Sequence, residues 1–348
     1  MGSLPLAALC AAAITLVCAA PAAGGMRPCL EGSTVRCHVF TGKVVSVGDG
    51  DTIDVDVAGD GTGRAWHVRI TGIQAMELSR YSSTASMRRG ACHSRDATRR
   101  MEGLVLRKRV RLLSQRRESY TAGPRHRARR AIQVRRRGRW IDPAAVLLRE
   151  GHALWSPSGS EWAWNKRNHD LAQRAAARGL RLYDRSYCGR GPGGDRAIAM
   201  SLRWDADGAD GLNISGEFAR IKNVSGRTLR LGGWRFRDSA LRYYRLPRGT
   251  RLEPGSALRI HVGGGTANPG DLFWGLNEPI FENPKHDGHA AGDGAYLFDP
   301  DGDLRAWVIY PCGCPQPGGE TSSGDGGGGG GEADSGAPPW AGGGGKDQ

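Results

Sequence analysis

The sequence predicts a mainly β protein of two modules, a small barrel with helices packed on it followed by a β-sandwich. The first observation is the order of predicted elements, because residues 40–188 mix strands with helices whereas residues 196–312 show only short strands and turns. The second is charge. Residues 40–188 hold 30 Lys and Arg against 14 Asp and Glu, and residues 189–348 hold 17 against 20. A length of 348 residues suits two domains.

Strand alternation and helical spacing assign the first module. Apolar residues alternate with polar ones in its strands, and Met87, Ala91, Met101 and Leu104 recur at helical spacing. Asp142 is placed to cap a helix that opens at Pro143. The predicted elements are a strand pair over Val44–Val57 broken by a turn at Gly48–Asp51, a strand over His67–Ile73, a helix over Ala85–Leu106, strands over Arg109–Ser114 and Arg130–Val134, and helices over Pro143–Arg149 and Glu161–Arg178.

Short strands separated by turn residues fill the second module, which indicates a β-sandwich. They are predicted at Glu217–Asn223, Thr228–Trp234, Arg242–Leu246, Ala257–Val262, Ala295–Phe298 and Leu304–Tyr310. A Gly/Pro linker over residues 189–195 precedes the module. The Gly-rich segment 316–348 has too few apolar residues to fold and is predicted to be disordered.

The N-terminal residues 1–23 are apolar and rich in alanine, which is typical of a signal peptide, so we expect secretion. No later apolar run is long enough to span a membrane. An even number of cysteines remains in the exported chain, which favours disulfides, and their spacing does not suit zinc. They are Cys29, Cys37, Cys92, Cys188, Cys312 and Cys314. Cys29–Cys37 and Cys92–Cys188 are candidate pairs among 15 possible complete pairings.

The basic excess of the first module indicates a polyanionic partner, with ordinary surface charge as the alternative. Clustered arginines make a plausible track for a nucleic-acid backbone, and such contacts carry little sequence information. The clusters are Arg88–Arg89, Arg99–Arg100, Arg107–Arg111, Arg116–Arg117 and Arg135–Arg139.

Acids and arginines of the first module have the chemistry that phosphodiester hydrolysis requires. That reaction needs a base for water, cations for the charge that develops on the phosphoryl oxygens and, usually, a metal. Asp49 and Asp51 lie two apart on a turn, where they can share a hard cation such as calcium. Arginine side chains such as Arg69 and Arg129 match phosphate oxygens in a bidentate manner. Taken alone, however, an Asp-Gly-Asp run is first of all a turn.

The order of the motifs is more specific. Gly42–Ile53, His67–Ile73 with Glu77, and Leu147–Ala153 together resemble the thermonuclease (staphylococcal-nuclease-like) family over residues 40–188. The resemblance implies a five-stranded OB-fold barrel with three helices. It also implies an endonuclease that hydrolyses DNA and RNA with calcium and leaves 3′-phosphate ends.

The same resemblance assigns roles to individual residues. Asp51 matches a calcium ligand and Asp49 the neighbouring acid. Arg69 matches the first phosphate-binding arginine, and Glu77 the carboxylate that activates or orients the attacking water. Arg129 is favoured as the second arginine, with Arg127 and Arg130 as alternates.

Position 74 departs from the family pattern. Gln74 falls where a second calcium-ligating aspartate is expected, and Ala75-Met76 replaces a Thr-Pro pair. The amide carbonyl can still ligate calcium, but the loss of a negative charge should weaken binding. The alternative function is therefore a non-catalytic extracellular protein that binds nucleic acid or another polyanion.

In the second module, Glu217–Gly226, Leu231–Asp238, Leu252–Gly263 and Gly294–Leu304 resemble the lamin-tail domain over residues 196–312. The resemblance implies an immunoglobulin-like sandwich, which we interpret as a binding or targeting domain with an unknown ligand. Two groups of acids have calcium-loop character, although solvated turns are the favoured interpretation. They are Asp205, Asp207 and Asp210, and Asp299, Asp301 and Asp303.

Overall fold

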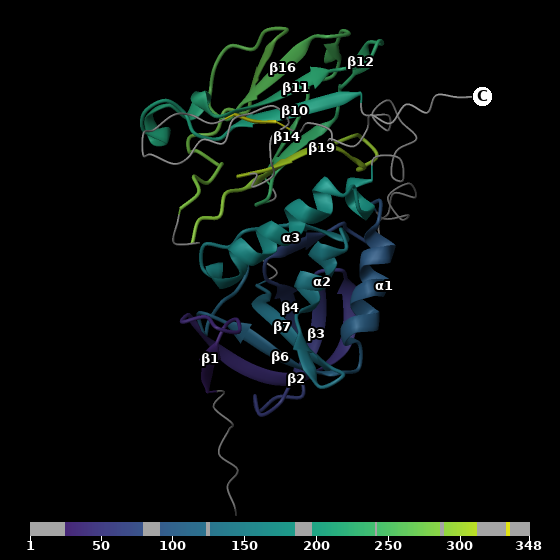
Figure 1. Ribbon diagram of the computed structural model, residues 1–348, viewed down its shortest axis with the longest axis vertical. Helices are drawn as coiled ribbons and strands as arrows, with labels where there is room; N and C mark the ends of the chain where they lie inside the picture. Colours follow the sequence, from purple (N-terminus) through teal and green to yellow (C-terminus); the bar gives the residue numbers. More distant parts are fainter. Residues whose placement is uncertain are drawn as a thin grey trace, which may run out of the picture.

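The computed structural model describes residues 25–78, 91–122, 126–184, 197–240, 242–285, 289–311 and the strand 332–334. Within these residues the protein is mainly β, with three α-helices. Two β-rich modules stack on each other, with α3 (Asn165–Ala177) between them and α1 (Ser94–Val105) along the flank of the first module (Figure 1). The predicted signal peptide, residues 1–23, and the linker, residues 189–195, lie outside the described residues.

Five strands of the first module form a ring of pairings. In hydrogen-bonded order they are β2 (Arg36–Asp49), β3 (Thr52–Val57), β4 (Trp66–Ile70), β7 (Ala128–Arg136) and β6 (Arg109–Ser114). Strand β6 also pairs with β2, which returns the path to its start. All neighbours are antiparallel except β4 and β7, which are parallel.

The alternation that predicted these strands arises because one face of each is buried. Val44, Ile53, Val68, Leu112 and Ile132 belong to a single buried cluster. Two short strands, β1 (Met26–Pro28) and β8 (Arg139–Ile141), extend the sheet beside β2 and β7.

The segment predicted as one strand, His67–Ile73, is interrupted at Gly72. The backbone of Gly72 has φ +83°, a conformation that favours glycine, so the chain turns there. Strand β5 (Ile73–Ala75) then leaves the main sheet and pairs with β9 (Ala153–Trp155). The alternation pattern did not predict strand β9.

The three helices are α1 (Ser94–Val105), α2 (Pro143–Arg149) and α3 (Asn165–Ala177). Helix α2 begins where predicted, and the Asp142 carboxylate accepts hydrogen bonds from the backbone N–H groups of Ala144 and Ala145. Helix α1 begins at Ser94 instead of Ala85, because His93 has φ 64° and interrupts a helix entering from before it. Residues 85–90 of that prediction lie outside the described residues.

Two sheets pack face to face in the second module. One contains β17 (Asp271–Phe273), β16 (Ala257–His261), β11 (Phe218–Asn223), β10 (Ile198–Arg203) and β20 (Glu332–Asp334); the other contains β14 (Tyr243–Arg245), β13 (Arg235–Asp238), β18 (Gly294–Phe298) and β19 (Leu304–Ile309). Strands β12 (Leu229–Arg230) and β15 (Arg251–Leu252) form a separate pair. Phe236, Leu258 and Ile260 are buried between the sheets.

Strand β20 differs from the prediction that all of residues 316–348 are disordered. It pairs antiparallel with β10, with Leu202 opposite Ala333. An outer strand such as β10 leaves a row of backbone groups unpaired, and almost any extended segment can satisfy them. Composition alone therefore does not exclude a short edge strand.

The two modules share a packed boundary. Tyr296, Phe298 and Ile309 of the second module belong to the buried cluster that fills the first. The Gln173 side-chain amide on α3 donates a hydrogen bond of 2.9 Å to the carbonyl of Ile309. The Trp162 ring, just before α3, stacks on His289 at 3.4 Å between centroids. Helix α3 thus links the cores of the two modules (Figure 1).

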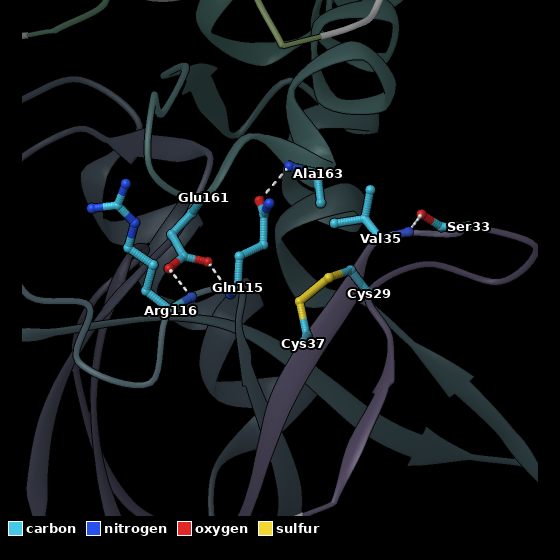
Figure 2. The surroundings of a disulfide bond; sticks show 8 residues. All are labelled: Cys29, Ser33, Val35, Cys37, Gln115, Arg116, Glu161 and Ala163. Atoms are coloured by element: carbon cyan, nitrogen blue, oxygen red, sulfur yellow. Dashed lines mark hydrogen bonds between the residues drawn. A yellow bond between two sulfur atoms is a disulfide. The ribbon is translucent and has the colours of Figure 1, made fainter.

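The predicted disulfide between Cys29 and Cys37 is present and fully buried, with Cα atoms 5.0 Å apart. Figure 2 shows it beside Glu161, whose carboxylate accepts hydrogen bonds from the backbone N–H groups of Gln115 and Arg116. Cys92 is also disulfide-bonded, but its predicted partner Cys188 lies outside the described residues.

Replacing both Cys29 and Cys37 by serine should lower the free energy of unfolding by about 2–3 kcal/mol. The reason is that the disulfide closes a short loop and so lowers the conformational entropy of the unfolded chain. Urea denaturation followed by fluorescence would measure the change, with the oxidised wild-type protein as the reference. An unchanged midpoint would contradict a stabilising role for this bond.

Candidate functional site

A turn between β2 and β3 places Asp51 in the interior of the first module. Its side chain is 1% exposed. The Asp51 N–H donates a 3.0 Å hydrogen bond to Asp49 Oδ1, which fixes the turn. A Cβ atom on Gly50 would lie 2.7 Å from Ala75 Cβ and 2.9 Å from Ala97 Cβ. Only glycine therefore allows β5 and α1 to pack this closely over the turn.

The buried Asp51 carboxylate is held from three directions. Its Oδ2 accepts a 2.6 Å hydrogen bond from the N–H of Ala75, and its Oδ1 accepts one of 3.0 Å from the hydroxyl of Thr52. Arg69 Nη1 also donates to Oδ1, while Arg69 Nη2 donates to Gln74 Oε1. One guanidinium thus joins the side-chain oxygens of Asp51 and Gln74.

Burial raises the pKa of Asp51 to about 7, although the Arg69 charge opposes the shift, and repulsion from Asp49 adds to it. Because the pKa is raised, the carboxyl is ionised above pH 7 and becomes protonated as the pH falls below it. A cation that needs the ionised carboxylate would therefore bind less well in acid.

Gln74 connects this pair to the third acid. Its side-chain amide donates to the carbonyl of Ala75 at 2.9 Å and to Glu77 Oε1 at 3.4 Å. The Glu77 side chain is exposed, so water reaches it. The structure therefore gathers Arg69, Gln74, Asp49 and Glu77 near Asp51.

Strand register decides which of the candidate arginines lies beside Arg69. Strands β4 and β7 are parallel, with Arg69 opposite Arg129 and Ile70 opposite Arg130. Residues opposite each other in neighbouring strands point to the same face, so Arg129 shares the face of Arg69. Burial lowers the pKa of Arg129, and the Arg69 charge lowers it further. Within the described residues, the Arg129 guanidinium makes no hydrogen bond.

The alternates Arg127 and Arg130 have other surroundings. Arg127 Nη1 donates to the Thr52 hydroxyl at 3.1 Å, at the margin of the site. Arg130 is fully buried and donates to the backbone carbonyls of Arg117, Ser119 and Arg129. Its guanidinium also lies over the rings of Phe40, Trp66 and Tyr120. Arg130 is thus a core residue and cannot reach a ligand on the Arg69 face.

One further arginine, Arg237 on β13, comes from the second module and was not among the predicted site residues. The Ser156 hydroxyl donates a hydrogen bond to the carbonyl of Ser239 at 3.2 Å, and the Ser156 N–H donates one to the carbonyl of Gly72 at 3.3 Å. These bonds hold the end of β13 against the β5–β9 pair. Burial lowers the pKa of Arg237, and the charges of Arg235 and Arg69 lower it further. Arg237 Nη2 is buried without a hydrogen-bond partner.

The donor set at Asp51 suits calcium better than a softer metal. The described residues contain no three His, Cys, Asp or Glu side chains close enough to form a metal site by themselves. However, the Asp51 and Gln74 oxygens lie close enough together to bond to one guanidinium. Carboxylate, amide carbonyl and water oxygens are what calcium prefers, so the same pair can hold this ion once Arg69 turns away.

The second module has two facing sheets around one apolar core, and the family comparison covers most of it. Its residues 203–312 match the model of the Lamin Tail Domain. This segment is therefore similar to lamin tail domains. The resemblance of the second module is thereby confirmed, and the lamin tail domain begins within β10. No curated protein matches the chain.

The family match does not extend into the first module, so the resemblance of that module to the thermonuclease family stays a prediction. As to membrane insertion, the described part of the chain contains no helix with the length and apolar character to cross a bilayer.

Changing Arg130 to Met should lower the free energy of unfolding by roughly 3 kcal/mol, because three backbone carbonyls lose their donor. Changing Arg129 to Met should alter it by less than about 1 kcal/mol, since no hydrogen bond is lost. Urea denaturation of the two variants measures this difference. Equal destabilisation would contradict the separation of a core arginine from a ligand-facing one.

Proposed function

We propose that the first module is a calcium-dependent endonuclease that hydrolyses phosphodiester bonds of DNA and RNA. The observation that carries the proposal is the arrangement around Arg69. This guanidinium bonds to the buried Asp51 and to Gln74, lies in register with Arg129 and is near the exposed carboxylate of Glu77. A base, an oxygen pair for a hard cation and two phosphate-binding groups therefore lie at one edge of the sheet.

Each side chain has a role in hydrolysis. Arg69 and Arg129 bind non-bridging oxygens of the scissile phosphate and stabilise the charge that develops there. Glu77 orients a water molecule and accepts its proton as the water oxygen bonds to phosphorus. The bond from phosphorus to the 5′ oxygen breaks, the 5′ oxygen takes up a proton, and a 3′-phosphate end remains. Asp51 and Gln74, beside Asp49, would hold calcium, which would supply further positive charge at the phosphate.

We also propose that the ring of strands is a closed OB-fold barrel. Supporting this are the five-strand path β2, β3, β4, β7 and β6 and the return pairing of β6 with β2. OB-folds present nucleic acid ligands on a strand face and on adjacent loops. Arg69 and the turn at Asp51 lie on such a strand and loop.

Secretion is part of the same proposal. The Cys29–Cys37 disulfide supports it, because such bonds persist in oxidising compartments. The excess of arginine in residues 40–188 gives the module a charge that attracts polyanions. The lamin tail domain would then serve as a binding domain, with no ligand assigned.

A second candidate is a non-catalytic protein that binds extracellular nucleic acid or another polyanion. The observation in its favour is Gln74, which gives the metal pocket one negative charge less than an aspartate would. Both candidates predict binding that weakens with added salt, so binding cannot separate them. Cleavage can.

Glu77 provides the direct test. We expect the secreted protein to clear DNA in a zymogram with calcium and to leave it intact with a chelator. Glu77→Gln should abolish clearing at every calcium concentration, because the group that accepts the proton is lost. Glu118→Gln, the same change at an exposed position of the same module, should clear DNA normally. Binding without clearing by the wild-type protein would support the second candidate.

Gln74→Asp should lower the calcium concentration needed for half-maximal cleavage by about tenfold, because calcium affinity follows ligand charge. The assay belongs at pH 8, where Asp51 is ionised. DNA binding measured in chelator should change little, since Arg129 and the surface arginines remain. An unchanged calcium requirement would show that position 74 does not face the cation.

A further inference from the structure

A second group of oxygen ligands lies in the lamin tail domain, on the connection between β10 and β11. The connection carries Asp205, Asp207, Asp210-Gly211 and Glu217. The spacing partly matches the calcium loop of helix–loop–helix proteins, in which five residues separate Asp-Gly from Glu. One extra residue stands before Asp210, and Asp207, at the second acidic position of that loop, faces solvent and pairs with Arg203. The connection is not a simple solvated hairpin turn, because it contains two 3-10 turns, over Asp210–Leu212 and Ile214–Gly216.

The structure brings this connection against a distant segment near Asn283. Glu217 is 0% exposed, and its Oε2 accepts hydrogen bonds from the N–H groups of Ile280 and Phe281 at 3.0 and 3.5 Å. The side-chain amide of Asn283 donates to Asp210 Oδ2 at 2.9 Å and to Asp205 Oδ1 at 3.3 Å. The carboxylates of Asp205 and Asp210 therefore meet the Asn283 amide, and Glu217 is bonded to the same distant segment at Ile280 and Phe281.

Three oxygens in this group are buried and lack any hydrogen-bond partner. They are Asp210 Oδ1, Glu217 Oε1 and Asn283 Oδ1. An acceptor buried in this way costs free energy, so such atoms are rare in proteins unless they serve a ligand. Two of them belong to the β10–β11 connection and the third to the distant segment at Asn283, which makes an accident of one loop conformation a poor explanation.

The charges of the group are also unbalanced. Burial raises the pKa of Glu217 to about 7, and repulsion from Asp210 and Asp205 raises it further. The nearby Arg203 forms its ion pair with Asp207, at 2.6 Å, and the Asp207 side chain is 81% exposed. The Asn283 amide is thus the donor that the structure provides between two carboxylates.

We infer that Asp210, Glu217 and Asn283 form a calcium site in the lamin tail domain, separate from the site at Asp51. All three ligand atoms are hard oxygens, and calcium accepts six to eight of these in flexible geometry. Rotation of the Asn283 amide turns its Oδ1 toward the ion and its Nδ2 away. Asp205 adds negative charge, and backbone carbonyls or water complete the shell. Two carboxylates with an amide give weak binding, about 0.1–1 mM, as in extracellular modules.

This inference does not depend on the nuclease activity of the first module, and the two sites can be measured apart. Asp51→Asn removes the central carboxylate of the first site, so binding that remains belongs elsewhere. Trp204 precedes Asp205 directly and stacks on Tyr310 with 4.5 Å between ring centroids. Its indole can therefore sensitise the emission of a terbium ion that occupies a calcium site beside it.

The experiment titrates terbium into the full-length Asp51→Asn protein and excites tryptophan. We expect saturable terbium emission that calcium displaces and that Trp204→Phe strongly reduces. Glu217→Gln and, as a second variant at a half-buried position, Asp210→Asn should each weaken terbium binding at least tenfold. Near-ultraviolet circular dichroism checks that each variant is folded.

Asp207→Asn is the matched control, because its side chain faces solvent; it should change the affinity less than about threefold. The inference is overturned if the Asp51→Asn protein gives no saturable emission, or if folded Glu217→Gln and Asp210→Asn bind terbium as before. It is also overturned if Asp207→Asn weakens binding as much as Glu217→Gln does. None of these outcomes bears on DNA cleavage by the first module.

Discussion

The buried carboxylate of Asp51 is the group on which the first module and its candidate site both depend. An ion removed from water must be met by charge and hydrogen bonds, and here Arg69, Thr52 and the Ala75 N–H provide them. Ala75 belongs to β5, which pairs with β9, and Ser156 after β9 contacts the lamin tail domain. The position of one carboxylate is thereby linked to strand pairing and to the domain boundary.

Arg69 has two functions that compete with each other. Without a ligand it neutralises Asp51 and bonds to Gln74, whereas in the proposed reaction it binds phosphate and leaves these oxygens to calcium. In the proposed reaction, binding of the metal and binding of the substrate would therefore be coupled, because each would replace a charge partner that the other removes. The charges of Arg237 and Arg69 act on each other, so the lamin tail domain contributes to the electrostatics of the site.

Local patterns in the sequence predicted the features that depend on local physics. Alternation located β2 and β3, the Asp142–Pro143 pair located the start of α2, and short spacing located the Cys29–Cys37 bond. The missed features are long-range. Strand β9 is visible only through its pairing with β5, and the charge of Arg237 acts on Arg69 only because the modules pack together. The acids around Glu217 were interpreted as solvated turns, because nothing local shows that Asn283 lies against them.

The central claim is that Asp51 and Gln74 exchange the Arg69 guanidinium for calcium when a phosphodiester binds. A crystal structure of the Glu77→Gln protein with calcium and a short DNA strand tests it most directly. The account predicts calcium bonded to Asp51 and Gln74 oxygens, with Arg69 and Arg129 turned onto one phosphate. Arg69 still bonded to both Asp51 and Gln74, with the DNA bound elsewhere on the arginine-rich surface, would contradict it.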